Sequence, residues 1–215
     1  MKRAFRFLLI LFLASRAAPA QEPSPPPPLS WPDLIGQGVV PYHQLTVEDF
    51  AINDEAKTND AFYIKTAIEP RSHYYLKPYN GFVFAFVDQW IVFSGLRKTE
   101  TTRRSEFKEM KASLPFAQAL LDLSEIYARQ LAAIKPGELP QARGDDAEKA
   151  KAEMERKLKE LVDAKLKALY DEQAAFLKAT DGGRNTKKVQ ERAAEIRKRL
   201  DATPNTTVPF HRPEF

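Results

Sequence analysis

The second half of the chain carries apolar residues at the spacing of amphipathic helices. Between residues 114 and 134 they recur at intervals of 4, 3, 4 and 7 and so share one face of a helix. In a globular protein such a stripe faces the core, so we expect these side chains to be buried. The members of the stripe are Phe116, Leu120, Leu123, Tyr127 and Ile134.

A much longer helix is predicted from about Ala147 to Ala179. Asp145 and Glu148 form a capping-box pattern at its start, and the run Thr180-Asp181-Gly182-Gly183 provides a stop at its end. The apolar stripe of this helix consists of Met154, Leu158, Leu161, Val162, Leu166, Leu169 and Phe176.

The first half of the chain is rich in strand-forming residues. We expect a strand over Ala61–Ile68, a turn at Glu69–Ser72 and a returning strand over His73–Leu76. The run Phe82–Phe93 is apolar on both sides of the pleat, which predicts a strand covered on two faces, with a turn at Asp88-Gln89.

A third helix follows the long one, capped by Asn185 or Thr186, with Val189, Ala193, Ile196 and Leu200 at intervals of 4, 3 and 4. The predicted fold is therefore α+β: an N-terminal antiparallel or mixed β-sheet followed by three helices, one of them long.

The segment Leu114–Arg129 resembles the metal-binding helix of a family of bacterial secreted zinc-protease-like proteins, a domain of unknown function. The family pattern is close to His-Glu-Gln-Gly-His-Phe-Asp-Ile-Ala-Glu-x-Tyr-Ala-Arg. The positions of this chain that match it are Gln118, Asp122, Glu125, Tyr127, Ala128 and Arg129.

The departures from the pattern fall on the positions that would bind zinc or act as the general base. In a His-Glu-x-x-His helix the two histidines bind one zinc ion and the glutamate acts as general base on the zinc-bound water. In the register of the resemblance, Phe116 and Leu120 stand at the histidine positions and Ala117 stands at the glutamate position. None of these three side chains can bind zinc or accept a proton.

Two further segments match in order. The run Phe176–Gly183 resembles the family's later Tyr-Asp-x-x-Thr-x-His-Gly segment, with Thr180 and Gly183 kept and Gly182 at the histidine, which the resemblance implies to be a third ligand. Leu45–Phe50 resembles the family's opening Leu-Thr-Trp-Asp-Asp-Phe. The resemblance spans residues 43 to 200 and implies a zincin-like fold.

The resemblance thus implies a zinc-protease-like domain without its metal ligands. We expect no metal, no cofactor and no catalytic residue, and a pseudoenzyme with a binding or structural role. One alternative is a helical adaptor of the cell envelope that uses the long charged helix. A second is a hydrolase with a rearranged site built from Asp122, Glu125, Tyr127 and Asp181, and a third is a site assembled from the dispersed His43, His73 and His211.

The ends of the chain predict export. Residues 1–20 have the basic start, short apolar run and Ala-Pro-Ala end of a signal peptide, and residues 21–30 form a Pro-rich linker. One domain is expected over 31–203, followed by a Pro-containing tail over 204–215 that is either disordered or a strap on the domain. A secreted or periplasmic protein is therefore predicted, without an integral membrane span after cleavage.

Charge excludes one class of partner. Of the 33 Lys and Arg residues four lie in the signal peptide, which leaves 29, equal to the 29 Asp and Glu residues. A formally neutral mature chain gives no support to nucleic-acid binding. An unknown protein or cell-envelope component is the expected partner. The chain has no cysteine, so it forms no disulfide.

Overall fold

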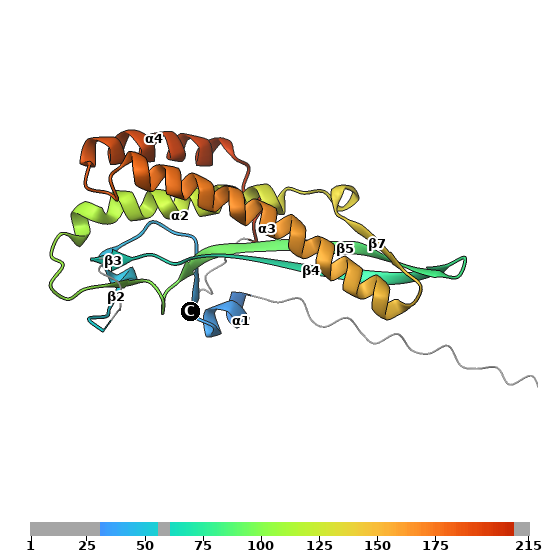
Figure 1. Cartoon of the computed structure of the whole chain (residues 1–215). Helices are drawn as coiled ribbons and strands as arrows, with labels where there is room; N and C mark the ends of the chain where they lie inside the picture. Colours follow the sequence, from blue (N-terminus) through green and yellow to red (C-terminus); the bar gives the residue numbers. More distant parts are fainter. Residues whose placement is uncertain (1–30, 56–60, 209–215) are drawn as a thin grey trace, which may run out of the picture.

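A long β-hairpin runs through the molecule. The computed structural model describes residues 31–55 and 61–208; the predicted signal peptide, the Pro-rich linker and residues 209–215 lie outside these ranges. Strand β4 (Thr66–Tyr79) pairs antiparallel with β5 (Phe82–Arg97) along its whole length (Figure 1). Asn80 and Gly81 connect them with φ angles of 49° and 78°, the left-handed conformations that a two-residue hairpin turn requires.

Two predicted turns are therefore wrong. The segment Glu69–Ser72 lies inside β4, and Asp88-Gln89 lies inside β5, where the pairing shifts register opposite His73 and Tyr74. Pro70 is accommodated because β4 pairs only with β5 and lies at the edge of the sheet. A proline at an edge can turn its missing N–H position away from the ladder, so it does not end the strand.

Two short strands share the other edge of β5. Strand β1 (Val39–Pro41) pairs with residues 95–97, and β7 (Gln141–Gly144) pairs with residues 83–86, both antiparallel. A second, small sheet joins β2 (Ala51–Ile52), β6 (Thr102–Arg103) and β3 (Phe62–Tyr63), with β6 in the centre. Short 3-10 turns lie at Val47–Asp49 and Pro136–Glu138.

Helices α2 (Met110–Ala132) and α3 (Ala147–Ala179) pack against the hairpin, and α4 (Thr186–Ala202) packs against α2. In Figure 1 α3 runs obliquely across the hairpin, and α4 lies above α2. The predicted α+β fold with one long helix is confirmed. The side chain of Asp146, rather than Asp145, caps α3 by accepting from the backbone of Lys149, because only the residue directly before the first turn can reach that N–H.

The apolar stripes predicted from the sequence meet in the core. Side chains of α2, α3 and α4 form one cluster whose fully or nearly buried members include Leu123, Leu169 and Leu200. A short helix, α1 (Trp31–Gly36), covers the opposite face of the sheet, where Trp31 packs edge-on against Phe93 at 5.1 Å between ring centroids. Of the residues that the structure describes, no helix is long and apolar enough to cross a membrane.

The covering of β5 is incomplete towards the hairpin tip. Val92 and Phe93 are buried, as the predicted two-faced strand requires. Nearer the turn, α3 packs on one face only, and the aromatic residues of the other face stack on each other with Tyr75 and Tyr79 about half exposed. The prediction of a strand covered on two faces is therefore wrong for this part of β5.

Candidate functional site

Three of the four positions that the resemblance assigns to zinc chemistry line one pocket. Phe116 and Leu120 come from α2, and Gly182 comes from the loop that joins α3 to α4. The pocket has a volume of about 800 Å³, and Gly183 also lines it. Residues more than 60 positions apart in the chain thus meet where the resemblance expects a metal, and they meet as apolar surface and backbone.

Aromatic packing fixes this side of the pocket. Phe116 is 7% exposed, stacks on Phe176 with ring centroids 5.4 Å apart and meets Phe62 edge-on at 6.0 Å. Gly183 has a φ of +92°, and a Cβ on it would lie 3.0 Å from the Phe116 ring. The glycine is therefore required twice, by its backbone conformation and by the close approach of the ring.

Ala117 does not take part in the pocket. It is fully buried in a different cluster, against Leu45, Phe50 and Leu96. Consecutive residues of a helix point about 100° apart, so Ala117 faces away from the stripe that contains Phe116. The fourth assigned position is thus core, and a carboxylate there would lie among apolar side chains.

The remaining lining of the pocket is mixed. Phe62, Tyr63, Ile64, Phe107, Tyr170 and Leu177 contribute aromatic and aliphatic surface, and Lys65, Thr66, Glu109, Ser113, Gln173 and Arg184 contribute polar groups. Among the residues that the structure describes, no group of three or more His, Cys, Asp or Glu side chains is placed to hold a metal ion. The described side chains offer apolar and polar contact surface rather than a set of ligands to a metal.

The polar residues retained from the pattern hold neighbouring segments together. The Gln118 Nε2 group donates to Asp122 Oδ1 at 2.7 Å, and its Oε1 accepts from the backbone N–H of Leu45 at 2.7 Å. Tyr42 Oη donates to the same Asp122 oxygen at 2.7 Å. Burial first, and then the bond to Asp122, raises the pKa of Tyr42. This network fastens the segment after β1 to α2.

A second buried pair fastens the end of α4. The Arg129 Nε group donates to Glu125 Oε1 at 2.8 Å, and Arg129 Nη1 donates to the carbonyl oxygens of Leu200 and Thr203. Glu125 is 2% exposed.

The other retained positions also have structural contacts. The Tyr127 hydroxyl donates to Glu172 of α3, and the Thr180 hydroxyl donates to the carbonyl of Phe176. Asp181 is exposed in the loop after α3, where it pairs with Arg184. The four acids and hydroxyls proposed for a rearranged hydrolase site therefore lie in separate contacts and are not brought together.

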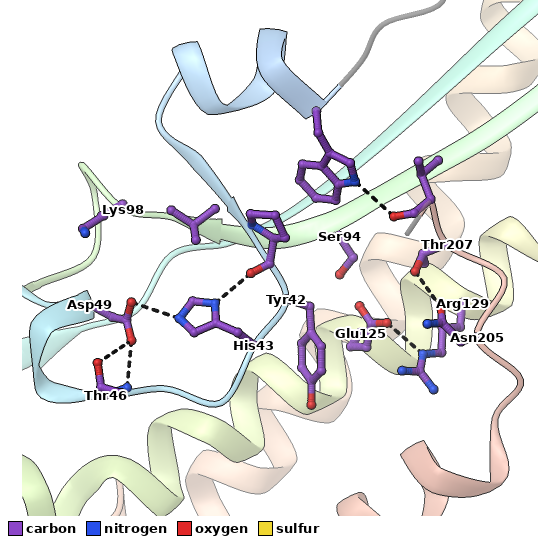
Figure 2. A pocket seen from close by; sticks show the side chains of 14 residues that line it. Tyr42, His43, Thr46, Asp49, Ser94, Lys98, Glu125, Arg129, Asn205 and Thr207 are labelled. Carbon is purple, nitrogen blue, oxygen red and sulfur yellow. Dashed lines mark hydrogen bonds and ion pairs between the residues drawn. The ribbon is translucent and has the colours of Figure 1, made fainter. Parts of the chain in front are cut away.

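A second pocket, which the sequence did not predict, lies on the other side of α2 (Figure 2). It has a volume of about 580 Å³ and is walled by segments from both ends of the chain: the region after α1, strand β5, helix α2 and the strap formed by residues 203–208. Polar side chains that line it include Tyr42, His43, Thr46, Asp49, Ser94, Lys98, Glu125, Arg129, Asn205 and Thr207.

The structure describes two of the three histidines, and each pairs with a different aspartate. His43 Nε2 lies 2.9 Å from Asp49 Oδ1, and its Nδ1 lies 2.7 Å from the carbonyl oxygen of Pro41. His73 pairs with Asp88 within the hairpin. The predicted alternative of a three-histidine site is not supported by these contacts, and His211 lies outside the described residues.

The lowered pKa of Asp49 predicts how the stability of this region depends on pH. Burial alone would raise its pKa, but hydrogen bonds from the Thr46 backbone and from His43 outweigh burial and lower the pKa below its usual range. A carboxylate with a lowered folded-state pKa contributes stability above the unfolded-state value of about 3.9, and that contribution is lost as the pH falls through the folded-state value.

Asp49→Asn is therefore expected to destabilise the protein near neutral pH and to matter progressively less in acid. Urea unfolding of both proteins between about pH 6 and about pH 3 measures the difference. A free-energy difference that stays constant over this range would show that the Asp49 charge does not contribute to stability.

No family model, curated protein or solved structure matches this chain. The resemblance to zinc-protease-like proteins therefore rests on the matching residues of the sequence alone.

Proposed function

We propose that this protein is an exported binding domain, a zinc-protease-like pseudoenzyme whose former metal pocket receives an apolar segment of a partner protein. The observation that carries the proposal is the convergence of Phe116, Leu120, Gly182 and Gly183 on one pocket. Three of the positions that the resemblance assigns to zinc ligands thus share one pocket, and this shared location is what supports the proposal. What the pocket offers in place of ligands is an aromatic and aliphatic surface interspersed with polar side chains.

Exposed apolar side chains at the entrance of the pocket favour a protein as the binding partner. Tyr170 and Leu177 of α3 line it and are 58% and 41% exposed. Side chains of this kind, partly exposed beside a buried aromatic wall, match the composition of interface cores. We therefore expect the partner to insert an aromatic or aliphatic side chain between α3 and the segment 61–66.

The helical adaptor is the less supported alternative. Away from Tyr170 and Leu177, the outward face of α3 carries ion pairs within the helix, among them Lys159–Asp163 and Lys167–Asp171. Such a face is a solvated one, whereas a helix that docks on another helix presents an apolar stripe.

Leu177→Arg tests the binding pocket. The substitution places a charge at the mouth, where Leu177 is exposed enough for the fold to tolerate it, so peptides that use the pocket are expected to bind at least about tenfold more weakly. The peptides are selected on the wild-type protein from a random library, and their affinities are measured by fluorescence anisotropy. Ile35→Arg on α1 is the matched control, since Ile35 is 45% exposed and does not line the pocket.

The same protein preparations test the lost metal site. Elemental analysis after growth in zinc-containing medium is expected to find far less than one zinc per chain, because no ligand remains at the assigned positions. About one zinc per chain, or selected peptides whose affinity does not change in Leu177→Arg, would contradict the proposal.

A further inference from the structure

Two residues that line the pocket in Figure 2 each carry a buried polar atom with no hydrogen-bond partner among the described residues. They are Ser94 Oγ on β5 and Glu125 Oε2 on α2, and both side chains line the pocket. Ser94 is 3% exposed and Glu125 is 2% exposed. A buried polar atom without a partner costs about 1–3 kcal/mol, so a fold that keeps two of them in one cavity indicates that something else completes their bonds.

The chemistry of the missing group follows from the two atoms. An ionised carboxylate oxygen accepts hydrogen bonds only, whereas a serine hydroxyl both donates and accepts. The complementary group therefore carries at least one donor for Glu125 and either a donor or an acceptor for Ser94. A hydroxyl, an amide or an ammonium group satisfies this condition.

The charges around the pocket disfavour an ammonium group as the occupant. Arg129 already neutralises Glu125 through a contact of 2.8 Å, and the guanidinium would repel a second cation brought to the same carboxylate. Lys98 and His43 add further basic groups to the wall, while the carboxylate of Asp49 is engaged by His43 and by Thr46. A neutral donor fits this arrangement better than a cation does.

Part of the pocket lining is apolar. Trp31, Val40 and Val208 form this part, and the Trp31 indole is held by a bond from Nε1 to the Val208 carbonyl oxygen at 3.1 Å. A pocket lined by polar groups and an aromatic ring suits a ligand that has hydroxyls on its edge and C–H groups on its face. Sugars have this character, and the volume of about 580 Å³ lies within the usual range of small-molecule sites.

We propose that this pocket binds a neutral polyhydroxy ligand, a mono- or disaccharide unit, through hydroxyl groups bonded to Glu125 and Ser94. This site lies apart from the pocket at Phe116 and does not depend on the function proposed above. Because the strap of residues 203–208 contributes Asn205, Thr207 and Val208 to the wall, the ligand also fixes the strap against β5, where Val208 N–H bonds the carbonyl of Val92.

Ser94→Ala is the informative variant. It removes one hydroxyl that has no bond within the fold, so the ligand-free protein is expected to melt at the same temperature as wild type or higher. Sugar binding is expected to weaken about tenfold through loss of the hydroxyl contact. Ser72→Ala, at an exposed serine on β4, is the matched control and is expected to bind sugar as wild type does.

The probes are glucose, N-acetylglucosamine and maltose as neutral sugars, putrescine as a diamine and citrate as an anion. Saturation-transfer NMR and calorimetric titration of wild type, Ser94→Ala and Ser72→Ala measure binding. Sugar binding that is lost selectively in Ser94→Ala supports the proposal. Three results would overturn it: no sugar bound with Kd below roughly 10 mM, which leaves solvent as the occupant; equal sugar affinity in wild type and Ser94→Ala; or a preference for putrescine or citrate over the sugars.

Discussion

Replacing Phe116 and Leu120 together by histidine is expected to lower the melting temperature by roughly 10 °C or more, with or without zinc. Both side chains are more than nine-tenths buried. Large-to-small changes in a core cost about 2–5 kcal/mol each, and an imidazole left without hydrogen bonds adds about 1–3 kcal/mol. Phe116 has the larger share of the effect, since its ring contacts Phe62, Phe176 and the backbone of Gly183.

Zinc is not expected to rescue the fold even when all four positions are restored. Gly182 has a φ of +62°, so histidine there is strained. Glutamate at Ala117 would be buried against Leu45 and Phe50, and a buried unpaired carboxylate is costly. The quadruple variant Phe116→His, Ala117→Glu, Leu120→His, Gly182→His is therefore expected to be the least stable of the set.

Thermal melting with chelator and with excess zinc measures both effects. The control is Ala112→His, which adds one histidine to an exposed position of the same helix and is expected to melt like wild type. If the double variant also melted like wild type, the packing of Phe116 and Leu120 would not contribute to stability. If zinc raised the melting temperature of the quadruple variant to the wild-type value, the pocket would still be able to assemble a metal site.

The helices could be predicted because their signals are local and agree with each other. The interval pattern of α3, the cap at its start and the left-handed residues from Asp181 to Gly183 all lie within a few residues of the positions they determine. The same holds for the last helix, where Asn185 accepts from the backbone of Lys188 as a cap.

The hairpin was predicted less well because strand signals depend on neighbours distant in the chain. Whether Pro70 ends a strand depends on whether that strand lies at an edge, and the sequence near Pro70 does not contain this information. The turn is formed instead at Asn80-Gly81, a local signal that the predicted turns overlooked, since both residues tolerate positive φ angles.

The two pockets also differ in how far the sequence pointed to their residues. Phe116, Leu120 and Gly182 are the positions that the resemblance assigns to zinc ligands, and they line one pocket. Nothing local marks Ser94 as the partner of a cavity that also contains Glu125, 31 positions later in the sequence. Asp122 and Glu125, which the sequence analysis considered for a rearranged hydrolase site, instead fasten separate segments to α2.

Arg129 is expected to be the most sensitive charged residue of the domain. Arg129→Ala would leave the carboxylate of Glu125 buried without its countercharge, with Oε2 already lacking a partner among the described residues. It would also remove the donor that serves the carbonyl oxygens of Leu200 and Thr203 at 3.2 and 2.9 Å. Removing one partner of a buried ion pair costs about 3–5 kcal/mol, so the free energy of unfolding is expected to fall by this amount.

Denaturant unfolding of three variants distinguishes the contribution of the Arg129–Glu125 ion pair from other effects of the substitutions. Arg129→Ala is expected to be strongly destabilised, whereas Glu125→Met with Arg129→Met is expected to recover most of the loss, because an apolar pair leaves no buried charge. Arg156→Ala breaks an exposed pair with Glu153 and is expected to have no measurable effect.

Since Arg129 also holds the start of the strap, proteolysis between residues 203 and 208 is expected to accelerate in Arg129→Ala and not in Arg156→Ala. Equal stability of Arg129→Ala and wild type would show that solvent reaches Glu125 and that the pair does not fasten α4 to α2.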